Sequence, residues 1–168
     1  MFAHQTISQF SKMLRNMDGW LEKATAFAKA KSFEPDVFMQ FRLAPDQYPL
    51  VRQVQSACDS AKFAAAYLSG KTPPSHPDTE TTMADARQRI ATVLANLETY
   101  KEADFAAADE RKVAPRWLEG AWLRGDHYLA QVAVPNFYFH VMTTYSILRH
   151  NGVDVGKTDF IGSLPVKT

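Results

Sequence analysis

The sequence predicts an all-α protein, a four-helix bundle with long connections, formed by one domain over residues 1–168. Three observations support this fold class. Apolar residues recur every three or four positions in four separate segments, which is typical of amphipathic helices. Tracts that contain proline and glycine separate those segments. The composition is that of a globular protein, with 46% hydrophobic and 22% charged residues.

The first two helices are predicted from their apolar stripes. The stripe of the first helix, over residues 6–31, comprises Ile7, Phe10, Leu14, Met17, Leu21, Ala24 and Phe27. The second helix spans residues 49–69, with the stripe Leu50, Val54, Ala57, Ala61, Ala64 and Leu68. Gly70 is placed to end it, because glycine readily adopts the left-handed conformation that follows many helices.

A capping box predicts where the third helix begins. Thr82 is followed three residues later by Asp85, so each side chain can bond to the other residue's backbone N–H. The buried face of this helix comprises Ile90, Val93, Leu94 and Leu97. The preceding tract, residues 71–80, is predicted to be a loop because its prolines remove backbone donors.

The connection over residues 101–125 is too long to lack structure of its own. We predict a small hairpin between the third and fourth helices, in which Val113–Leu118 returns through Ala121–Leu123. Such a hairpin is expected to place Trp117 and Trp122 against one end of the bundle.

The last predicted helix, residues 126–150, is the most unusual segment. Between Tyr128 and Leu148 it carries no charged residue. Because a surface helix normally has a polar face, we predict that a second copy of the protein covers this one, in a homodimer through the fourth helix. The polar side chains in the run argue against the alternative of a membrane span. Pro135 is expected to kink the helix.

Composition excludes several classes of function. The formal net charge is +1, so neither nucleic acid nor a membrane surface is expected as a partner. No hydrophobic signal segment opens the sequence, which favours a cytoplasmic location. The single cysteine, Cys58, excludes an intrachain disulfide and is expected to pack as an inert apolar side chain.

Two long segments resemble an uncharacterised bacterial family. They are RLAPDQYPLVRQVQSACDSAK at residues 42–62 and PNFYFHVMTTYSILRHNGV at 135–153, followed by GKTDFIGSL. The sequence is similar here to a domain of unknown function related to the DinB and YfiT-like four-helix bundles, a superfamily that includes metalloenzymes. The resemblance implies a helical bundle, usually dimeric. It also implies that many relatives hold a divalent metal with three histidines and that some are thiol-dependent transferases.

The metal site of those relatives is not reproduced in this sequence. In the relatives the last helix contributes two histidines four residues apart, and the matching pair here is Asn136 and His140. The second helix, which contributes the third histidine there, has none here and offers Gln53, Gln55, Cys58 and Asp59. A transition-metal site usually needs three good protein ligands. We therefore expect no cofactor and no tightly bound metal; a divalent metal held by His140 is the alternative.

A small polar pocket is predicted around His140 and Asn136, with Gln55 and Asp59 as further candidate residues. The alternative for His140 is a buried structural imidazole bonded to Asn136, a threonine or a backbone carbonyl near the kink. The alternative for Gln55 and Asp59 is a solvated helix face paired with neighbouring basic side chains.

The sequence identifies no catalytic residue and leaves open whether the protein is an enzyme. The first hypothesis is a homodimeric bundle whose metal-free pocket takes a small-molecule ligand. The second is a metal-dependent, thiol-using transferase or hydrolase with His140 as a metal ligand. The third is a non-catalytic structural or stress-related dimer.

Overall fold

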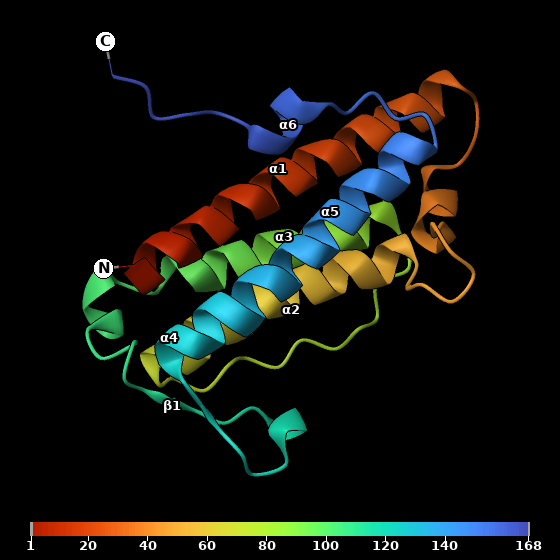
Figure 1. Ribbon diagram of the computed structural model, residues 1–168. Coiled ribbons are helices and arrows are strands. Elements are labelled where there is room, and N and C mark those ends of the chain that lie inside the picture. Colours follow the sequence, from red (N-terminus) through yellow and green to blue (C-terminus); the bar gives the residue numbers. More distant parts are fainter. Residues whose placement is uncertain (1, 168) are drawn as a thin grey trace.

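Four long helical segments form the bundle. The computed structural model describes residues 2–167 (Figure 1). Its α-helices are α1 (Phe2–Ala30), α2 (Leu50–Ser69), α3 (Met83–Glu98), α4 (Gly125–Tyr128), α5 (Val134–His150) and α6 (Lys157–Ile161). Short 3₁₀-helices span Pro35–Gln40, Glu102–Phe105 and Arg116–Leu118, and strands β1 (Lys112–Val113) and β2 (Leu123–Arg124) pair antiparallel. The predicted all-α bundle is confirmed.

The order of the helices around the bundle differs from their order in the chain. α2 packs against α3 and α5, and α1 packs against the same two helices. Figure 1 shows that α2 and α3 run in the same direction, because residues 71–81, here called the strap, return along the bundle before α3 begins. This crossover lays an extended, proline-rich segment beside α2.

The helix ends follow local signals in the sequence. Gly70 ends α2 with a φ of 77°, a left-handed conformation that glycine adopts without strain. The side chain of Thr82 accepts from the backbone N–H of Asp85, and the Asp85 carboxylate accepts from that of Thr82, so the capping box is confirmed. Helix α1 starts earlier than predicted, because Ala3 extends the buried stripe that includes Ile7.

The last long helical segment is continuous from residue 125 to residue 150 but contains a π-helical turn, Leu129–Ala133. Pro135 follows within this continuous segment, where it has no backbone N–H to donate to the preceding turn. The expected distortion at Pro135 therefore takes the form of one widened turn. Asn136 and His140 follow directly on α5.

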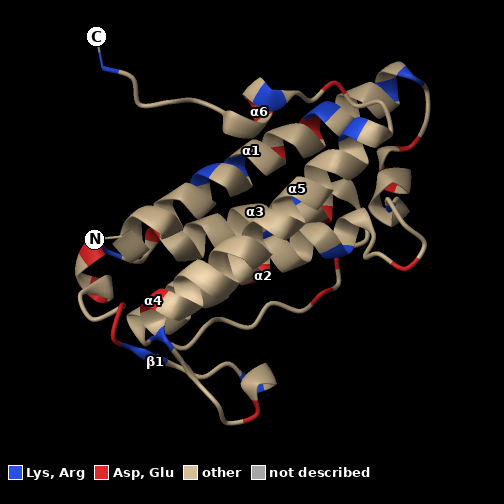
Figure 2. Cartoon of the chain, in the orientation of Figure 1, with Lys and Arg blue, Asp and Glu red and all other residues tan. Residues whose placement is uncertain are grey.

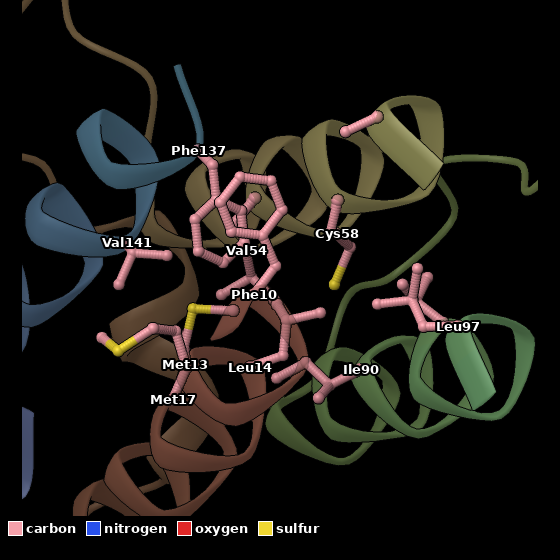
Figure 3. Close-up of a cluster of buried hydrophobic side chains, with 14 of the residues drawn as sticks. Phe10, Met13, Leu14, Met17, Val54, Cys58, Ile90, Leu97, Phe137 and Val141 are labelled. Atoms are coloured by element: carbon pink, nitrogen blue, oxygen red, sulfur yellow. The ribbon is translucent and has the colours of Figure 1, made fainter. Parts of the chain in front are cut away.

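The apolar core lies among all four long helices (Figure 3). Phe10 of α1 stacks on Phe137 of α5 with ring centroids 4.0 Å apart. Cys58 of α2 is completely buried, and this burial raises the pKa of its thiol to about 12. The thiol therefore stays protonated, and Cys58 packs as the apolar side chain that was predicted.

The hairpin between α3 and α4 is confirmed, with strands shorter than predicted: residues 112–113 pair with 123–124. The expected position of the tryptophans was wrong, because Trp117 and Trp122 are 61% and 51% exposed. Residues 114–122, here called the hairpin loop, lie outside the four long helices, as Figure 1 shows. The backbone hydrogen bonds within this loop hold it to itself and not to the helices.

The outer face of α5 remains open. Figure 2 shows α5 without charge until its last turn, and on this face Phe139 and Met142 are 56% and 50% exposed. Among the helices of residues 2–167, none has the length and apolar character that crossing a membrane requires.

Candidate functional site

A pocket of about 830 Å³ lies between α2 and α5, beneath the strap and the hairpin loop. We call it the α2–α5 pocket. The polar side chains on its lining include Ser56, Asp59, Ser60, Lys62, Asn136 and His140, and its aromatic side chains are Phe63, Tyr67, Trp117 and Tyr128. The α2 residues of this set recur mainly at three- and four-residue spacing, so one side of the helix faces the pocket.

A chain of hydrogen bonds fixes the imidazole of His140. Gln53, completely buried on α2, donates from Nε2 to the backbone oxygen of Tyr48 over 3.0 Å. Because a carbonyl oxygen can only accept, this contact turns Oε1 of Gln53 towards His140, whose Nδ1 lies 2.8 Å away. Oε1 also only accepts, so Nδ1 of His140 carries the proton. Nε2 of the neutral ring then keeps a free lone pair.

Burial keeps His140 uncharged at neutral pH. The residue is only 8% exposed, and desolvation, followed by the nearby Arg52 cation, lowers its pKa below the ordinary histidine value. His140 lines the α2–α5 pocket, and within residues 2–167 its Nε2 makes no hydrogen bond. The site therefore presents a hydrogen-bond acceptor to whatever occupies the pocket.

The structure brings two other predicted site residues, Asn136 and Asp59, to the same pocket. Nδ2 of Asn136 donates to Oγ of Ser60 over 2.6 Å, and Ser60 in turn donates to the backbone oxygen of Ser56. Asn136 is thus engaged with α2 and is not the partner of His140. The expected partners of His140 were wrong because sequence reasoning did not place Gln53 opposite it.

Gln55, the fourth predicted site residue, lies outside this pocket. Its Nε2 donates to Glu80 of the strap over 2.7 Å, and its Oε1 accepts from Arg52 over 3.2 Å. The basic neighbour expected in the alternative is present, as Arg52, but the face is not solvated, since Gln55 is only 5% exposed. The cause is the strap, which covers this side of α2.

Beneath the strap lies a cluster of charged side chains whose buried centre, Arg89, sequence reasoning missed. Arg89 of α3, with a side chain 2% exposed, donates to Asp59 over 2.8 Å and to Glu80 over 3.1 Å. Lys62, 3% exposed, lies 2.7 Å from the same oxygen of Asp59, and Asp78 of the strap lies 3.4 Å from Arg89. Charges this deep are tolerated only when paired. We call these five residues the charge cluster; it ties the strap to α2 and α3.

His76 of the strap lines the pocket near the charge cluster. Its Nδ1 is buried and has no hydrogen-bond partner in the part of the chain that the structure describes. Burial lowers the pKa of His76, and the cations of Lys62 and Arg89 lower it further. A second neutral imidazole therefore lies on the pocket wall.

The donor set around His140 does not fit a transition metal. His140 offers a single donor atom, Nε2, the amide of Asn136 is engaged with Ser60, and Asp59 is shared by two cations. In residues 2–167 no three side chains of the His, Cys, Asp and Glu types are grouped so that they could hold a metal ion. The three-histidine arrangement implied by the resemblance is not reproduced.

The bundle topology, with His140 on its last long helix, defines the class as a DinB-like helical bundle. The chain is 49% identical to a DinB family member protein from Shewanella denitrificans, whose crystal structure matches with a TM-score of 0.95 over 100% of this chain and 96% of that chain. The chain belongs to the DUF1993 family, a domain of unknown function, which matches residues 2–161. No curated protein gives a significant match. The family resemblance inferred from the sequence is confirmed.

Proposed function

We propose that the protein binds a small organic molecule in the α2–α5 pocket without a tightly bound metal. Nε2 of His140 accepts a hydrogen bond or a proton from that molecule. The observation that carries this proposal is the pair of hydrogen bonds that links the backbone oxygen of Tyr48 through Gln53 to His140. These bonds hold the imidazole in one tautomer with Nε2 unoccupied. A buried ring with one nitrogen fixed and the other open is suited to recognition.

The same arrangement also suits proton transfer. A neutral histidine whose Nδ1–H is held by an acceptor is oriented as a general base. The acceptor here is an amide and not a carboxylate, so it orients the ring without strongly stabilising the imidazolium. Hydrogen-bond acceptance is therefore the main role that we assign to His140, and proton uptake is limited to ligands that carry an acidic proton.

Metal content tests the metal-independent part of this proposal. Untagged protein, purified without chelator and without a nickel column, should carry far less than one zinc, nickel, iron or manganese per chain by elemental mass spectrometry. The variant His140→Gln should give the same result. About one metal per chain in the wild type, lost in His140→Gln, would support the alternative of a metal-dependent transferase or hydrolase.

We also propose that two copies associate through the outer face of α5. The stripe comprises Pro135, Phe139 and Met142 of α5 and Gln131 of the preceding π-helical turn. They recur at three- and four-residue spacing, and none is charged. Phe139 and Met142 are each at least half exposed. A twofold axis across this stripe places the same apolar patch of each copy against the other, which is how most homodimers are built.

Light scattering tests the dimer. We expect the wild type to have the mass of two chains at micromolar concentration and Phe139→Glu to have the mass of one. In a twofold dimer the new carboxylate would lie opposite the same carboxylate of the second copy, and the two would repel each other. The matched control is Trp122→Glu, which changes an equally exposed side chain on the hairpin loop and should stay dimeric. A monomeric wild type contradicts the proposal.

A further inference from the structure

The lining of the α2–α5 pocket carries an excess of positive charge. Lys62 and Arg116 are its cationic side chains, and Asp59 is its acidic one. One oxygen of Asp59 already lies 2.7 Å from Lys62 Nζ and 2.8 Å from a guanidinium nitrogen of Arg89. Arg89 is also paired with Glu80 and Asp78, so the charge cluster carries no surplus cation and Arg116 is the uncompensated charge on the lining.

Arg116 is the cation that remains available to a ligand. It lies on the hairpin loop, and within residues 2–167 its guanidinium has neither an ion pair nor a hydrogen bond. Arg124, at the base of the same hairpin, pairs with Glu110 and Asp126. A guanidinium without a partner presents a fork of donors that matches a carboxylate.

Aromatic side chains provide flat apolar surface beside this cation. Trp117 follows Arg116 and lines the pocket although it is 61% exposed. Phe63 and Tyr67 of α2 are stacked, with ring centroids 5.7 Å apart and an angle of 10° between the rings. Such surfaces favour a planar or aromatic partner.

The base of the hairpin is fixed against the bundle. A Cβ atom on Gly125 would lie 1.8 Å from the backbone oxygen of Ala108, so only glycine fits there. The backbone N–H of Asp126 donates to the oxygen of Asp109 over 3.1 Å. These contacts close the base of the hairpin, and Arg111 ties it to α2 by donating from Nε to the backbone oxygen of Leu68 over 3.0 Å. The loop carries Arg116 and Trp117 on the pocket lining.

We propose that the pocket takes a small organic carboxylate with a planar, apolar body. Arg116 pairs with the carboxylate, and the body packs among Trp117, Phe63 and Tyr67. The inference rests on the proposed function and adds the chemical class of the ligand. Nε2 of His140 remains free for a donor group elsewhere on that ligand.

Three matched probes test the inference in the full chain: naphthalene-2-carboxylate, naphthalene-2-carboxamide and the cation of 2-(aminomethyl)naphthalene. Binding is followed at neutral pH by the indole N–H of Trp117 and the ring of His140 in ¹H–¹⁵N spectra. We expect the carboxylate to bind about tenfold more tightly than the amide, and the cation to bind most weakly.

Substitution at Arg116 locates the charge that the carboxylate meets. Arg116→Gln should weaken binding of the carboxylate to the level of the amide and leave the amide unchanged. The control Arg149→Gln makes the same charge change in the last turn of α5 and should affect neither probe. Equal effects of the two substitutions overturn the inference, because the carboxylate is then not held by Arg116.

The remaining outcomes separate this inference from the proposed function. If the amide or the cation binds as tightly as the carboxylate does and shifts the signals of Trp117 and His140, the inferred carboxylate class is wrong and the proposal of a ligand pocket stands. If none of the three probes shifts those signals in the millimolar range, both proposals are contradicted.

Discussion

Arg89→Ala is expected to lower the free energy of unfolding by about 3–5 kcal/mol. The guanidinium of Arg89 is buried and reaches Asp59, Glu80 and the backbone oxygen of Pro77. Its removal leaves Glu80, whose side chain is only 10% exposed, without its cation. The buried carboxylate then keeps its desolvation cost and loses the attraction that offset it. Urea denaturation measures the change.

Arg87→Ala is the matched control, on the same helix. The Arg87 side chain is 37% exposed and pairs with Asp18 over 2.7 Å. An ion pair this close to solvent contributes about 1 kcal/mol or less. Equal losses for the two variants would contradict the structural role of the charge cluster, because burial would then make no difference.

Gln53→Ala should destabilise the protein by about 2–4 kcal/mol. The substitution removes a completely buried amide and leaves both Nδ1–H of His140 and the backbone oxygen of Tyr48 without partners. The His140 ring also loses the contact that selects its tautomer. Urea denaturation measures the stability, and ¹⁵N spectra of the ring report the tautomer.

The control for Gln53→Ala is Gln88→Ala, at an exposed position of α3, for which a change within about 0.5 kcal/mol is expected. Gln53→Glu gives a second comparison, because a carboxylate beside His140 should raise the pKa of the ring. A loss of stability for Gln53→Ala no larger than that for Gln88→Ala would show that the hydrogen bonds linking Tyr48, Gln53 and His140 do not stabilise the fold.

Local signals predicted most of the fold. The capping box at Thr82, the glycine that ends α2 and the apolar stripes depend on residues close together in the chain, so sequence reasoning could identify them. The tryptophans of the hairpin loop were misplaced because apolar character alone does not distinguish a core residue from one at a pocket mouth. Trp117 lines the pocket and remains largely exposed.

The candidate site was predicted only in part, because its contacts join distant segments. His140 and Asn136 stood out as one pair on one helix, whereas Gln53 reaches His140 across 87 positions of the chain. The burial of Arg89 was hidden for the same reason: it depends on the strap returning along α2, and no local pattern encodes that path. Gln55 was misassigned because the strap covers it.

The tautomer of His140 tests the central claim most directly. A long-range ¹H–¹⁵N spectrum of protein with labelled histidine, recorded at neutral pH, should show Nδ1 protonated and Nε2 unprotonated. A pH titration of the same signals should give a pKa below the ordinary histidine value. A ring that is protonated on Nε2, or one that titrates as an exposed histidine does, would contradict the account.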